Sequence, residues 1–489
     1  MQQTTTPPSI HEDRLKHTQA RASYWEKYAL LPGRWETTRA YYRERLQEIY
    51  RFLVPPGLRV LELGSGTGDL LACLEPSQGL GIDACAAMVE RARGSHPDPR
   101  LEFRKGDVHE LKHELRKDAP FDVIICSDLA NELWDVQEVL EQARLVSHSG
   151  TRLIINNYSR LWEIPRRIAD SLGLAKPQLS QNWLTVDDIG NLLELADFEV
   201  IRSSSEIMAP LWVPLLSRFC NRYLVKVAPF RMFGITNFVI ARPKPQPVDP
   251  EPIVTVVVAA RNEAGNIPAL FDRVPDMGAG TELIIVEGNS SDDTYAAVER
   301  EMAKRQRPMT KLYKQPGKGK GDAVREGFSH ATGGVLMILD ADLTVPPEDL
   351  PRFYEAWRRR QGEFINGVRL VYPMRDGAMR FFNLIGNKFF SLAFSWLLGQ
   401  SIKDTLCGTK VLSKEHYEVI ARNRAYFGEI DPFGDFDLIF GAAKYNLRIV
   451  DLPIRYRERI YGDTNINRWS HGVILLRMVV LAMRRIKFV

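Results

Sequence analysis

Two aspartates of the sequence, Asp340 and Asp342, stand two positions apart where the apolar run 335–339 ends. Side chains at alternate positions of an extended segment share a face, so both carboxylates can hold one hard cation. A Mg²⁺ or Mn²⁺ ion placed there can bridge to a diphosphate and neutralise the charge that develops as this group departs. The pair therefore predicts metal-assisted transfer from a nucleotide-activated donor, with Asp340 and Asp342 as catalytic residues and metal ligands.

Charged residues of three further segments have the chemistry to bind the same donor. Carboxylates that follow apolar strands can bind a ribose or the edge of a base. A loop rich in glycine and lysine, residues 317–321, can bring N–H groups and positive charge to a phosphate. The residues concerned are Glu263, Glu287, Asp292, Lys318 and Lys320. Together they predict a nucleotide site in the second half of the chain.

The first half of the chain carries a different nucleoside-binding pattern. An apolar run at residues 59–63 leads into Gly64, Gly66 and Gly68. Glycines at such a place let the backbone turn tightly and approach a ligand closely. A carboxylate about twenty residues further on, Asp83, can accept hydrogen bonds from both hydroxyl groups of a ribose. This half is therefore predicted to bind a cofactor that contains a nucleoside.

Alternating strands and helices must position these residues. Short apolar runs alternate with helical patterns in both halves, which is typical of parallel sheets covered by helices. The runs are residues 58–63, 80–82, 121–126 and 152–155 in the first half, and 253–259, 282–286 and 335–339 in the second. The segment 242–252 has five prolines in eleven residues and should interrupt both helix and sheet. We therefore expect two α/β domains, 1–241 and 253–489, joined by a stiff linker.

The composition of the 489-residue chain excludes several classes of protein. Hydrophobic residues make up 45% and charged residues 26%, which excludes a mostly disordered or collagen-like chain. A net charge of +4 is too small to indicate a nucleic-acid partner. The five cysteines form no C-x-x-C pair, so no zinc ribbon or disulfide framework is indicated, and the set suits a reducing cytosol. No apolar run reaches the ~18 residues that cross a bilayer, so we expect a cytoplasmic protein with membrane contact limited to its surface.

The motifs of the first half resemble class I S-adenosylmethionine-dependent methyltransferases, over residues 20–241. The resemblance implies a Rossmann-like fold with S-adenosylmethionine as cofactor. Its implied contacts are Glu62, Gly64, Gly66 and Gly68 at the methionine moiety, Asp83 at the ribose, and Asp107 and Val108 at the adenine. Asp128 is the candidate general base for a hydroxyl acceptor, because deprotonation during attack lowers the barrier. The equally weighted alternative is that Asp128 caps the next helix.

The motifs of the second half resemble inverting family 2 glycosyltransferases of the glycosyltransferase A fold, over about residues 253–470. Among these, they are most similar to dolichyl-phosphate mannose synthases and bacterial polyprenyl-phosphate glycosyltransferases. The resemblance implies a nucleotide-sugar donor and Mg²⁺ or Mn²⁺ on Asp340 and Asp342. Its implied donor contacts are Glu263, Glu287, Asp292, Lys318, Lys320 and Arg459. The chain departs from the family pattern at Glu287-Gly288, where a double aspartate is usual, and at Thr344, where glutamine is frequent.

The resemblance leaves two kinds of acceptor open. For a sugar or protein hydroxyl, Asp435 or Asp437 stands where relatives carry a catalytic carboxylate. A lipid phosphate needs no strong base, because the second pKa of a phosphate monoester lies near ~6. Cations must then bind the acceptor, and Arg369 and Arg380 match family arginines in that role. Arginine suits it because its guanidinium can bind phosphate bidentately.

Apolar segments with cationic neighbours predict peripheral contact with a membrane. Residues 388–399 are rich in Phe, Trp and Leu, and residues 473–483 precede Arg484 and Arg485. An apolar helix with cationic residues can lie in the plane of the headgroups. The segment 211–227 is also apolar and basic, and for it we favour core packing over a lid or a membrane contact.

The sequence thus predicts a bifunctional cytoplasmic enzyme that contacts the cytoplasmic face of a membrane peripherally. The second domain would transfer a sugar, with inversion, from a nucleotide donor to a polyprenyl phosphate. The first domain would methylate a substrate of the same pathway. Two alternatives remain open: a hydroxyl acceptor for the sugar, and a first domain that serves only as a binding or scaffolding module.

Overall fold

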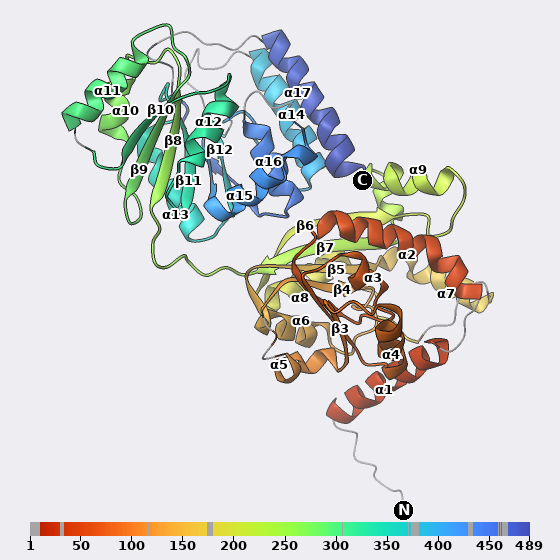
Figure 1. Ribbon diagram of the computed structural model, residues 1–489. Coiled ribbons are helices and arrows are strands. Elements are labelled where there is room, and N and C mark those ends of the chain that lie inside the picture. The colour runs from red at the N-terminus through yellow and green to blue at the C-terminus, as the bar shows by residue number, and fades with distance from the viewer. Residues whose placement is uncertain are drawn as a thin grey trace, which may run out of the picture. The chain divides into compact units, whose positions relative to one another are not determined.

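The computed structural model describes most of the chain in two compact units. The described residues are 10–29, 34–115, 118, 120–173, 179–305, 307–369, 371–372, 381–428, 434–457, 459, 461 and 468–489. The first unit comprises Met1–Lys244 with Phe488–Val489, and the second comprises Pro245–Lys487. Each unit is built around a single seven-stranded sheet with helices on its faces (Figure 1).

The first unit has the strand order β3-β2-β1-β4-β5-β7-β6, with only β7 antiparallel to its neighbours. Its strands are β1 (Arg59–Leu63), β2 (Gln78–Asp83), β3 (Leu101–Lys105), β4 (Phe121–Ser127), β5 (Ser147–Tyr158), β6 (Phe198–Ile207) and β7 (Thr236–Pro243). Its helices are α1 (Ile10–Ala29), α2 (Arg34–Leu53), α3 (Asp69–Cys73), α4 (Ala86–Ser95), α5 (Leu111–Glu114), α6 (Val136–Leu145), α7 (Glu163–Ser171), α8 (Val186–Leu195) and α9 (Leu216–Arg222). The strand order reverses between β1 and β4, and open α/β sheets bind ligands at the carboxyl ends of strands at such a point.

Apolar residues fill both faces of this sheet. Leu61 and Ile124 belong to one core cluster, and their neighbours Val60 and Val123 belong to the cluster on the other face. Alternate side chains of a strand point to opposite faces, so a strand covered on both sides is apolar along its whole length. This is the physical reason why short continuous apolar runs marked these strands.

The second unit has the strand order β10-β9-β8-β11-β13-β12-β14, with only β13 antiparallel to its neighbours. Its strands are β8 (Val254–Ala260), β9 (Thr281–Glu287), β10 (Thr310–Lys314), β11 (Val335–Asp340), β12 (Phe364–Val368), β13 (Lys410–Ser413) and β14 (Ile449–Pro453). Its helices are α10 (Ile267–Arg273), α11 (Thr294–Arg305), α12 (Lys320–Ser329), α13 (Leu350–Arg358), α14 (Phe381–Leu398), α15 (Lys414–Arg422), α16 (Asp435–Lys444) and α17 (Arg468–Ala482). The order again reverses, between β8 and β11, which places the carboxyl end of β11 at a ligand-binding position.

The proline-rich segment begins inside the first unit's sheet, contrary to the prediction that no strand continues past residue 241. Strand β7 runs to Pro243, with Arg242 opposite Glu199 and Pro243 opposite Phe198 of β6. The pairing of β7 with β5 has already ended at Ala241, so the missing N–H of Pro243 leaves no ladder bond unmade on that side. The buried Arg242 also forms an ion pair with Glu199, which holds this strand end in place.

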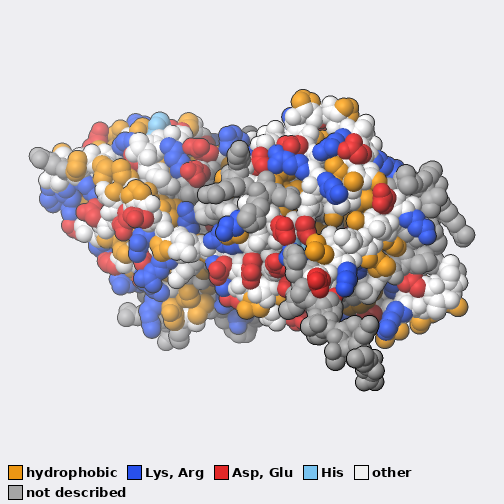
Figure 2. Space-filling view, turned by 90° about the horizontal axis from the view of Figure 1, so that it is seen from below, with side chains coloured by type: hydrophobic (Ala, Val, Ile, Leu, Met, Phe, Trp, Pro, Cys, Tyr) orange, Lys and Arg blue, Asp and Glu red, His pale blue; other side chains and the backbone are white. Residues whose placement is uncertain are grey.

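The surface carries charges of both signs. On the face shown in Figure 2, acidic and basic side chains are interspersed, and hydrophobic side chains form separate small groups between them. None of the described helices combines the length and the apolar character that crossing a bilayer requires.

Candidate functional site

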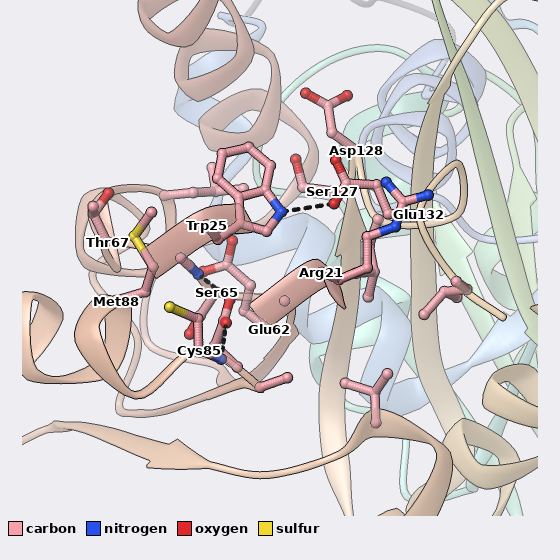
Figure 3. Close-up of a pocket in the computed structure, with 18 of the residues that line it drawn as sticks. Arg21, Trp25, Glu62, Ser65, Thr67, Cys85, Met88, Ser127, Asp128 and Glu132 are labelled. Atoms are coloured by element: carbon pink, nitrogen blue, oxygen red, sulfur yellow. Dashed lines mark hydrogen bonds between the residues drawn. The ribbon is translucent and has the colours of Figure 1, made fainter. Parts of the chain in front are cut away.

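The first unit holds a cavity of about 690 Å³ at the reversal point of its sheet. The turn after β1, the ends of β2 and β4, and one face of α1 line it. In the close-up of Figure 3, Arg21 and Trp25 of α1 lie beside Glu132 and Asp128. The indole N–H of Trp25 donates a hydrogen bond to Glu132 at 2.8 Å. Helix α1 therefore closes one side of the cavity.

Asp83 fixes the glycine turn and faces the cavity. Its two carboxylate oxygens accept hydrogen bonds from the backbone N–H groups of Gly66 and Cys85, both at 2.8 Å. Burial raises the pKa of Asp83, and these two backbone bonds oppose the rise. Gly64 and Gly66 have φ values of 70° and 51°, which other residues rarely adopt. The turn and the carboxylate are thus held in one arrangement before any ligand binds.

Gly68 does not border the cavity, in contrast to Gly64 and Gly66. A Cβ atom on Gly68 would lie 2.5 Å from the ring of Phe103, and its φ is 75°. Packing against β3 and a left-handed backbone at the start of α3 account for this glycine. Its proposed contact with the cofactor has no support in the geometry.

Glu62 is a buried carboxylate whose Oε2 has no hydrogen-bond partner, although the residue lines the cavity. Burial raises its pKa well above the ordinary value. Asp107 lies on the same cavity and accepts hydrogen bonds from the backbone N–H and Nδ1 of His109, at 3.0 and 2.7 Å. Val108 lines the wall next to it. Glu62 with its one unpartnered oxygen, a fixed Asp83 and an oriented Asp107 fit a cofactor with ammonium, ribose and base.

Substituting Glu62 by glutamine should stabilise the cofactor-free first unit increasingly as the pH rises above about 4. The raised pKa of Glu62 means that its contribution to stability is present below the ordinary glutamate pKa and is lost as the pH rises through the folded-state value. Glutamine carries no such titration. Calorimetric melting at several pH values, without S-adenosylmethionine, measures the difference. A difference that does not change between pH 4 and pH 8 would contradict the assignment.

Asp128 stands at the centre of a hydrogen-bonded group. It accepts hydrogen bonds from Tyr42 Oη at 3.0 Å, Asn156 Nδ2 at 2.6 Å and Tyr158 Oη at 3.2 Å. Its φ of 53° places it in the left-handed region, as is frequent at functional sites. The alternative role as a helix cap is wrong, because Asp135 caps α6. Hydrogen bonds to a carboxylate favour its charged form and weaken it as a base, so the group is better suited to orient an acceptor.

Near this end of the sheet, Asn131 has a structural role, and several residues that line the cavity were not predicted from the sequence. Asn131 is fully buried, and its amide bonds Asn182 O at 2.6 Å and Tyr158 N at 3.0 Å. Sequence reasoning missed the cavity-lining residues of α1, namely His17, Arg21 and Trp25. They precede the glycine turn by a whole helix, and no local pattern ties them to it.

The predicted metal ligands of the second unit both contact cationic side chains. Asp340, the last residue of β11, forms an ion pair with Lys320 at the start of α12. Asp342 accepts a hydrogen bond from Arg459 Nη2 at 2.8 Å and one from Thr344 Oγ1 at 2.8 Å. Burial would raise the pKa of Asp340, but Lys320 outweighs it and holds the pKa below the ordinary value. Lys320 therefore favours the charged form of Asp340, and each of the two carboxylates has a cationic partner.

Arg459 also joins a second strand end to this group. Its Nη1 lies 3.5 Å from Oε1 of Glu263, which follows β8. Burial raises the pKa of Glu263, while a hydrogen bond from Asn266 Nδ2 at 2.6 Å lowers it. Four predicted residues thus meet at the carboxyl ends of β8 and β11: Glu263, Asp340, Asp342 and Arg459, with Lys320 beside Asp340.

Three predicted donor contacts are placed differently. Glu287 is buried and accepts a hydrogen bond from the backbone N–H of Ser290, so it shapes its own loop. Asp292 accepts hydrogen bonds from the backbone N–H groups of Thr294 and Ala264, at 3.1 and 3.3 Å. Lys318 is exposed on the glycine-rich loop. Among the described residues, none of the three forms a hydrogen bond or an ion pair with Asp340, Asp342, Lys320 or Arg459, which we call the Asp340 group. Their role toward the donor stays a prediction.

The two candidate bases are ion-paired. Asp435 opens α16, and its Oδ1 lies 3.3 Å from Nζ of the fully buried Lys410. Asp437 contacts Arg424 at 3.0 Å and Arg325 at 3.5 Å. Burial raises the pKa of Asp437, and the two arginines oppose this. Each carboxylate thus has a cationic partner, although Asp435 Oδ1 accepts no hydrogen bond within the described residues.

Two glycines bring the starts of α12 and α16 together. Gly434 precedes α16 with a φ of 75°, and a Cβ atom on it would lie 2.4 Å from the Cα of Gly321 in α12. This close approach sets Lys320 and Asp435 near each other, and Asp435 contributes to the electrostatic environment of Lys320. Lys320, Asp340, Lys410 and Asp435 therefore form one cluster of alternating charge.

Arg369, a predicted acceptor-binding residue, holds another carboxylate. Its Nε and Nη2 donate to the two oxygens of the buried Asp404 at 2.7 and 2.9 Å. Its guanidinium also lies over the ring of Tyr456, 5.3 Å from the centroid. The second predicted acceptor residue, Arg380, lies outside the described residues. The geometry gives Arg369 a structural role, and its role toward an acceptor stays a prediction.

Replacing Arg369 by methionine should lower the free energy of unfolding of the second unit by about 3–5 kcal/mol, because a buried charge loses its partner. Burial would raise the pKa of Asp404, but Arg369 outweighs it and lowers the pKa. The contribution of the Arg369–Asp404 pair to stability is thus present above the ordinary aspartate pKa. It is lost as the pH falls through the lower pKa that Asp404 has in the folded state. Scanning calorimetry measures the loss, with the exposed Arg352→Met as control. A loss below about 1 kcal/mol, the range of surface ion pairs, would contradict it.

The Asp340 group fits a metal only with help from a ligand. Within the described ranges, no three His, Cys, Asp or Glu side chains gather as a metal site. Mg²⁺, however, is usually bound by one or two carboxylates together with substrate phosphates and water. Asp340 and Asp342 offer such hard oxygen donors. Asp340 and Asp342 would therefore hold a divalent ion together with the diphosphate of a donor.

Comparison with known proteins gives a different family for each unit. Residues 255–420 match the family model for glycosyl transferase family 2, and residues 55–197 match the model for a methyltransferase domain. Dolichol-phosphate mannosyltransferase of Pyrococcus furiosus is 28% identical over 219 residues, which are 44% of this chain and 59% of that protein. Undecaprenyl-phosphate 4-deoxy-4-formamido-L-arabinose transferase of Klebsiella pneumoniae is 24% identical over 217 residues, 43% of this chain and 62% of that protein. The chain thus spans about three fifths of either relative.

One solved structure that aligns with the first half is magnesium protoporphyrin IX methyltransferase from Synechocystis PCC 6803 with bound SAH. Its sequence identity to this chain is 15%, and the alignment covers 48% of this chain and 100% of that one. The TM-score is 0.33.

Proposed function

We propose that this chain, which joins a methyltransferase domain to a glycosyl transferase family 2 domain, acts with both activities in one pathway. The second domain transfers a sugar, with inversion, from a nucleotide-sugar to a polyprenyl phosphate. The first domain uses S-adenosylmethionine to methylate a substrate of the same pathway. The relatives named for dolichol phosphate and undecaprenyl phosphate support this choice of acceptor class.

The observation that carries the sugar transfer is the meeting of Asp340 and Asp342 with two cations. Lys320 and Arg459 already lie against these carboxylates, where the diphosphate of a donor would be held. A bound Mg²⁺ or Mn²⁺ ion would supply further neutralisation of the departing charge. Asp340 and Asp342 would hold the ion, and Lys320 and Arg459 beside them would bind phosphate oxygens, with Glu263 orienting Arg459.

The ion pairs of Asp435 and Asp437 favour the phosphate acceptor over a hydroxyl. A general base must present a free lone pair within hydrogen-bond reach of the proton it takes. Two arginines contact Asp437, and Lys410 balances the charge of Asp435, although Asp435 Oδ1 accepts no hydrogen bond within the described residues. A phosphate monoester is already anionic near neutral pH, so its oxygen can attack the sugar without such a base.

Helices α14 and α17 support a position of the second unit at a membrane surface. The two helices pack on each other, and each presents large apolar side chains to solvent. These are Phe389 and Leu392 on α14, and Val473, Leu476 and Val480 on α17. The exposed Arg484 and Arg485 follow α17. Such a surface would lie where a polyprenyl chain is anchored.

The geometry of the first unit supports a complete cofactor site rather than a scaffold. Glu62, Asp83 and Asp107 line one cavity, and two of them are oriented by hydrogen bonds. Methyl transfer depends mainly on the alignment of its two substrates, and Asp128 with its two tyrosines would hold the acceptor.

A product assay tests the proposal. Full-length protein is incubated with UDP-, GDP- and dTDP-sugars, Mn²⁺ and a short polyprenyl phosphate, and products are identified by mass spectrometry. We expect a glycosyl phosphodiester, and near-normal turnover in Asp435→Asn and Asp437→Asn. Transfer to a hydroxyl, abolished by either substitution, would establish the alternative acceptor. Failure to bind S-adenosylmethionine by calorimetry would leave the first domain as a scaffold.

The shared pathway is tested separately. A short tether can hold one site at ~mM effective concentration relative to the other, which is the physical advantage of fusion. With S-adenosylmethionine added to the same assay, we expect products that carry both a methyl group and a sugar. Methyl and sugar found always on separate molecules would refute a common substrate.

A further inference from the structure

The first unit carries an exposed apolar surface that neither proposed reaction uses. We define the α7–α9 patch as the large apolar side chains of residues 160–172 and 211–233 that are exposed to solvent. They are Leu161, Ile164, Ile168, Leu172, Leu211, Trp212, Val213, Leu215, Leu216, Phe219, Tyr223, Val227, Phe230, Met232 and Phe233. The exposed fractions reach 67% for Ile164 and 86% for Leu215. The interpretation of 211–227 as core packing is therefore wrong for these side chains.

The two segments of the patch, residues 160–172 (the α7 segment) and residues 211–233 (the α9 segment), lie next to each other. The indole N–H of Trp162, just before α7, donates a hydrogen bond to the carbonyl of Phe233 at 3.2 Å. The backbone N–H of Ser159 donates to the carbonyl of Ile235 at 2.7 Å. These bonds hold the start of the α7 segment against the end of the α9 segment, so the apolar side chains belong to one region of the unit.

The polarity of the α9 segment is the reverse of that of an ordinary surface helix. Its polar residues Ser217 and Asn221 are buried, whereas Leu215, Leu216 and Phe219 face solvent. Asn221 Oδ1 accepts from the backbone N–H groups of Met208 and Ala209, both at 2.8 Å. Ser217 Oγ bonds the backbone of Val213 and Leu211 at 2.8 and 2.6 Å. The buried polar side chains thus fix the loop so that its apolar side chains point outward.

The charge of the α9 segment identifies what covers it. Residues 211–233 contain four basic residues and no acidic one. Lys226 is buried in an ion pair with Glu206, which leaves Arg218, Arg222 and Arg231 exposed among the apolar side chains. Arg218 lies over the ring of Trp212 and Arg222 over that of Tyr223, each 5.8 Å from the centroid. Such a surface matches an anionic bilayer, because its apolar side chains can enter the hydrocarbon region while its arginines contact the anionic headgroups.

We propose that the α7–α9 patch docks the first unit on an anionic lipid bilayer, with Leu215, Leu216 and Phe219 inserted and the arginines at the headgroups. This gives the methyltransferase domain a membrane contact of its own, made by elements distinct from α14 and α17. A large exposed apolar surface on a soluble domain usually marks an interaction site, and the basic rim selects the anionic bilayer.

Vesicle flotation of the full-length protein tests the docking. One set of vesicles contains phosphatidylcholine with about 30% phosphatidylglycerol, which gives a negatively charged surface. The other set contains phosphatidylcholine alone. One variant combines Leu215→Asp with Phe219→Asp, because these side chains are 86% and 54% exposed. A second variant, Arg218→Glu with Arg231→Glu, changes only exposed charge. The matched control is Leu195→Asp, because Leu195 is 64% exposed at the end of α8, outside the patch.

We expect each patch variant to lower partition onto anionic vesicles about tenfold or more, and the control to leave it unchanged. Leu392→Asp on α14 measures the contribution of the second unit independently. Unchanged melting with S-adenosylmethionine shows that a variant is folded. Wild-type partition in both patch variants, or no binding of the wild type to anionic vesicles, would overturn the proposal. A patch variant that instead dissociates an oligomer, with vesicle binding intact, would assign the patch to a second copy of the chain.

Discussion

Substituting Asp340 or Asp342 by asparagine is expected to lower sugar transfer about a thousandfold, the scale seen when a preorganised charge-stabilising group is removed. Asparagine keeps the shape of aspartate but removes the charge that binds a divalent ion. It also removes the carboxylate that pairs with Lys320, or one of the two carboxylates that contact Arg459. Initial rates with the nucleotide-sugar found in the donor panel, measured across a Mn²⁺ titration, give the effect.

The control for both variants is Asp276→Asn, because Asp276 is a mostly exposed carboxylate of the same unit, paired with Arg307. We expect the control to transfer sugar at the wild-type rate and all three variants to keep methyl transfer. An Asp340→Asn protein that transfers sugar within about tenfold of the wild-type rate would show that these carboxylates do not hold the departing group.

Substituting Asp83 by either alanine or asparagine should weaken binding of S-adenosylmethionine by about a hundredfold or more. A hydrogen bond to a charged group contributes about 1.5–3 kcal/mol, and a ribose would make two to this carboxylate. Both oxygens of Asp83 also accept a backbone N–H, from Gly66 and from Cys85. An asparagine turns its NH₂ group toward one of these donors in either orientation. The amide should therefore rescue nothing.

Isothermal titration with S-adenosylmethionine and S-adenosylhomocysteine measures this loss. Asp98→Ala removes a partly exposed carboxylate of the same unit, paired with Arg100, and serves as the control. Sugar transfer by the Asp83 variants should match the wild type. An Asp83→Asn protein with wild-type affinity would mean that the cofactor does not use this carboxylate.

Local pattern was sufficient for the strands and for the residues at their ends. The run 59–63 is strand β1 in the structure, and the run 335–339 lies in β11, because strands covered on both faces need unbroken apolar sequence. Glu62, Asp83 and Asp107 line the cavity because parallel strands bring their carboxyl ends to one edge. The fold class and this part of the site were therefore readable.

Contacts between residues that lie far apart in the chain could not be predicted from the sequence. Asp404 lies 35 residues beyond Arg369, and no periodicity of the sequence indicates that its carboxylate pairs with the guanidinium of Arg369. Arg21 and Trp25 reach the cavity only because α1 packs over it. The orientation of 211–233 depends on the burial of Ser217 and Asn221, which its apolar composition hides. In each case tertiary packing decides what the residue contacts.

The close approach of Gly321 and Gly434 limits how this protein can change over evolutionary time. An alanine at Gly434 would drive its methyl group into the backbone of Gly321, and the adjoining helices would have to separate. Lys320 and Asp435 would then move apart as well. Among descendants of this sequence we therefore expect Gly434 to resist substitution, even where the surrounding loops diverge freely.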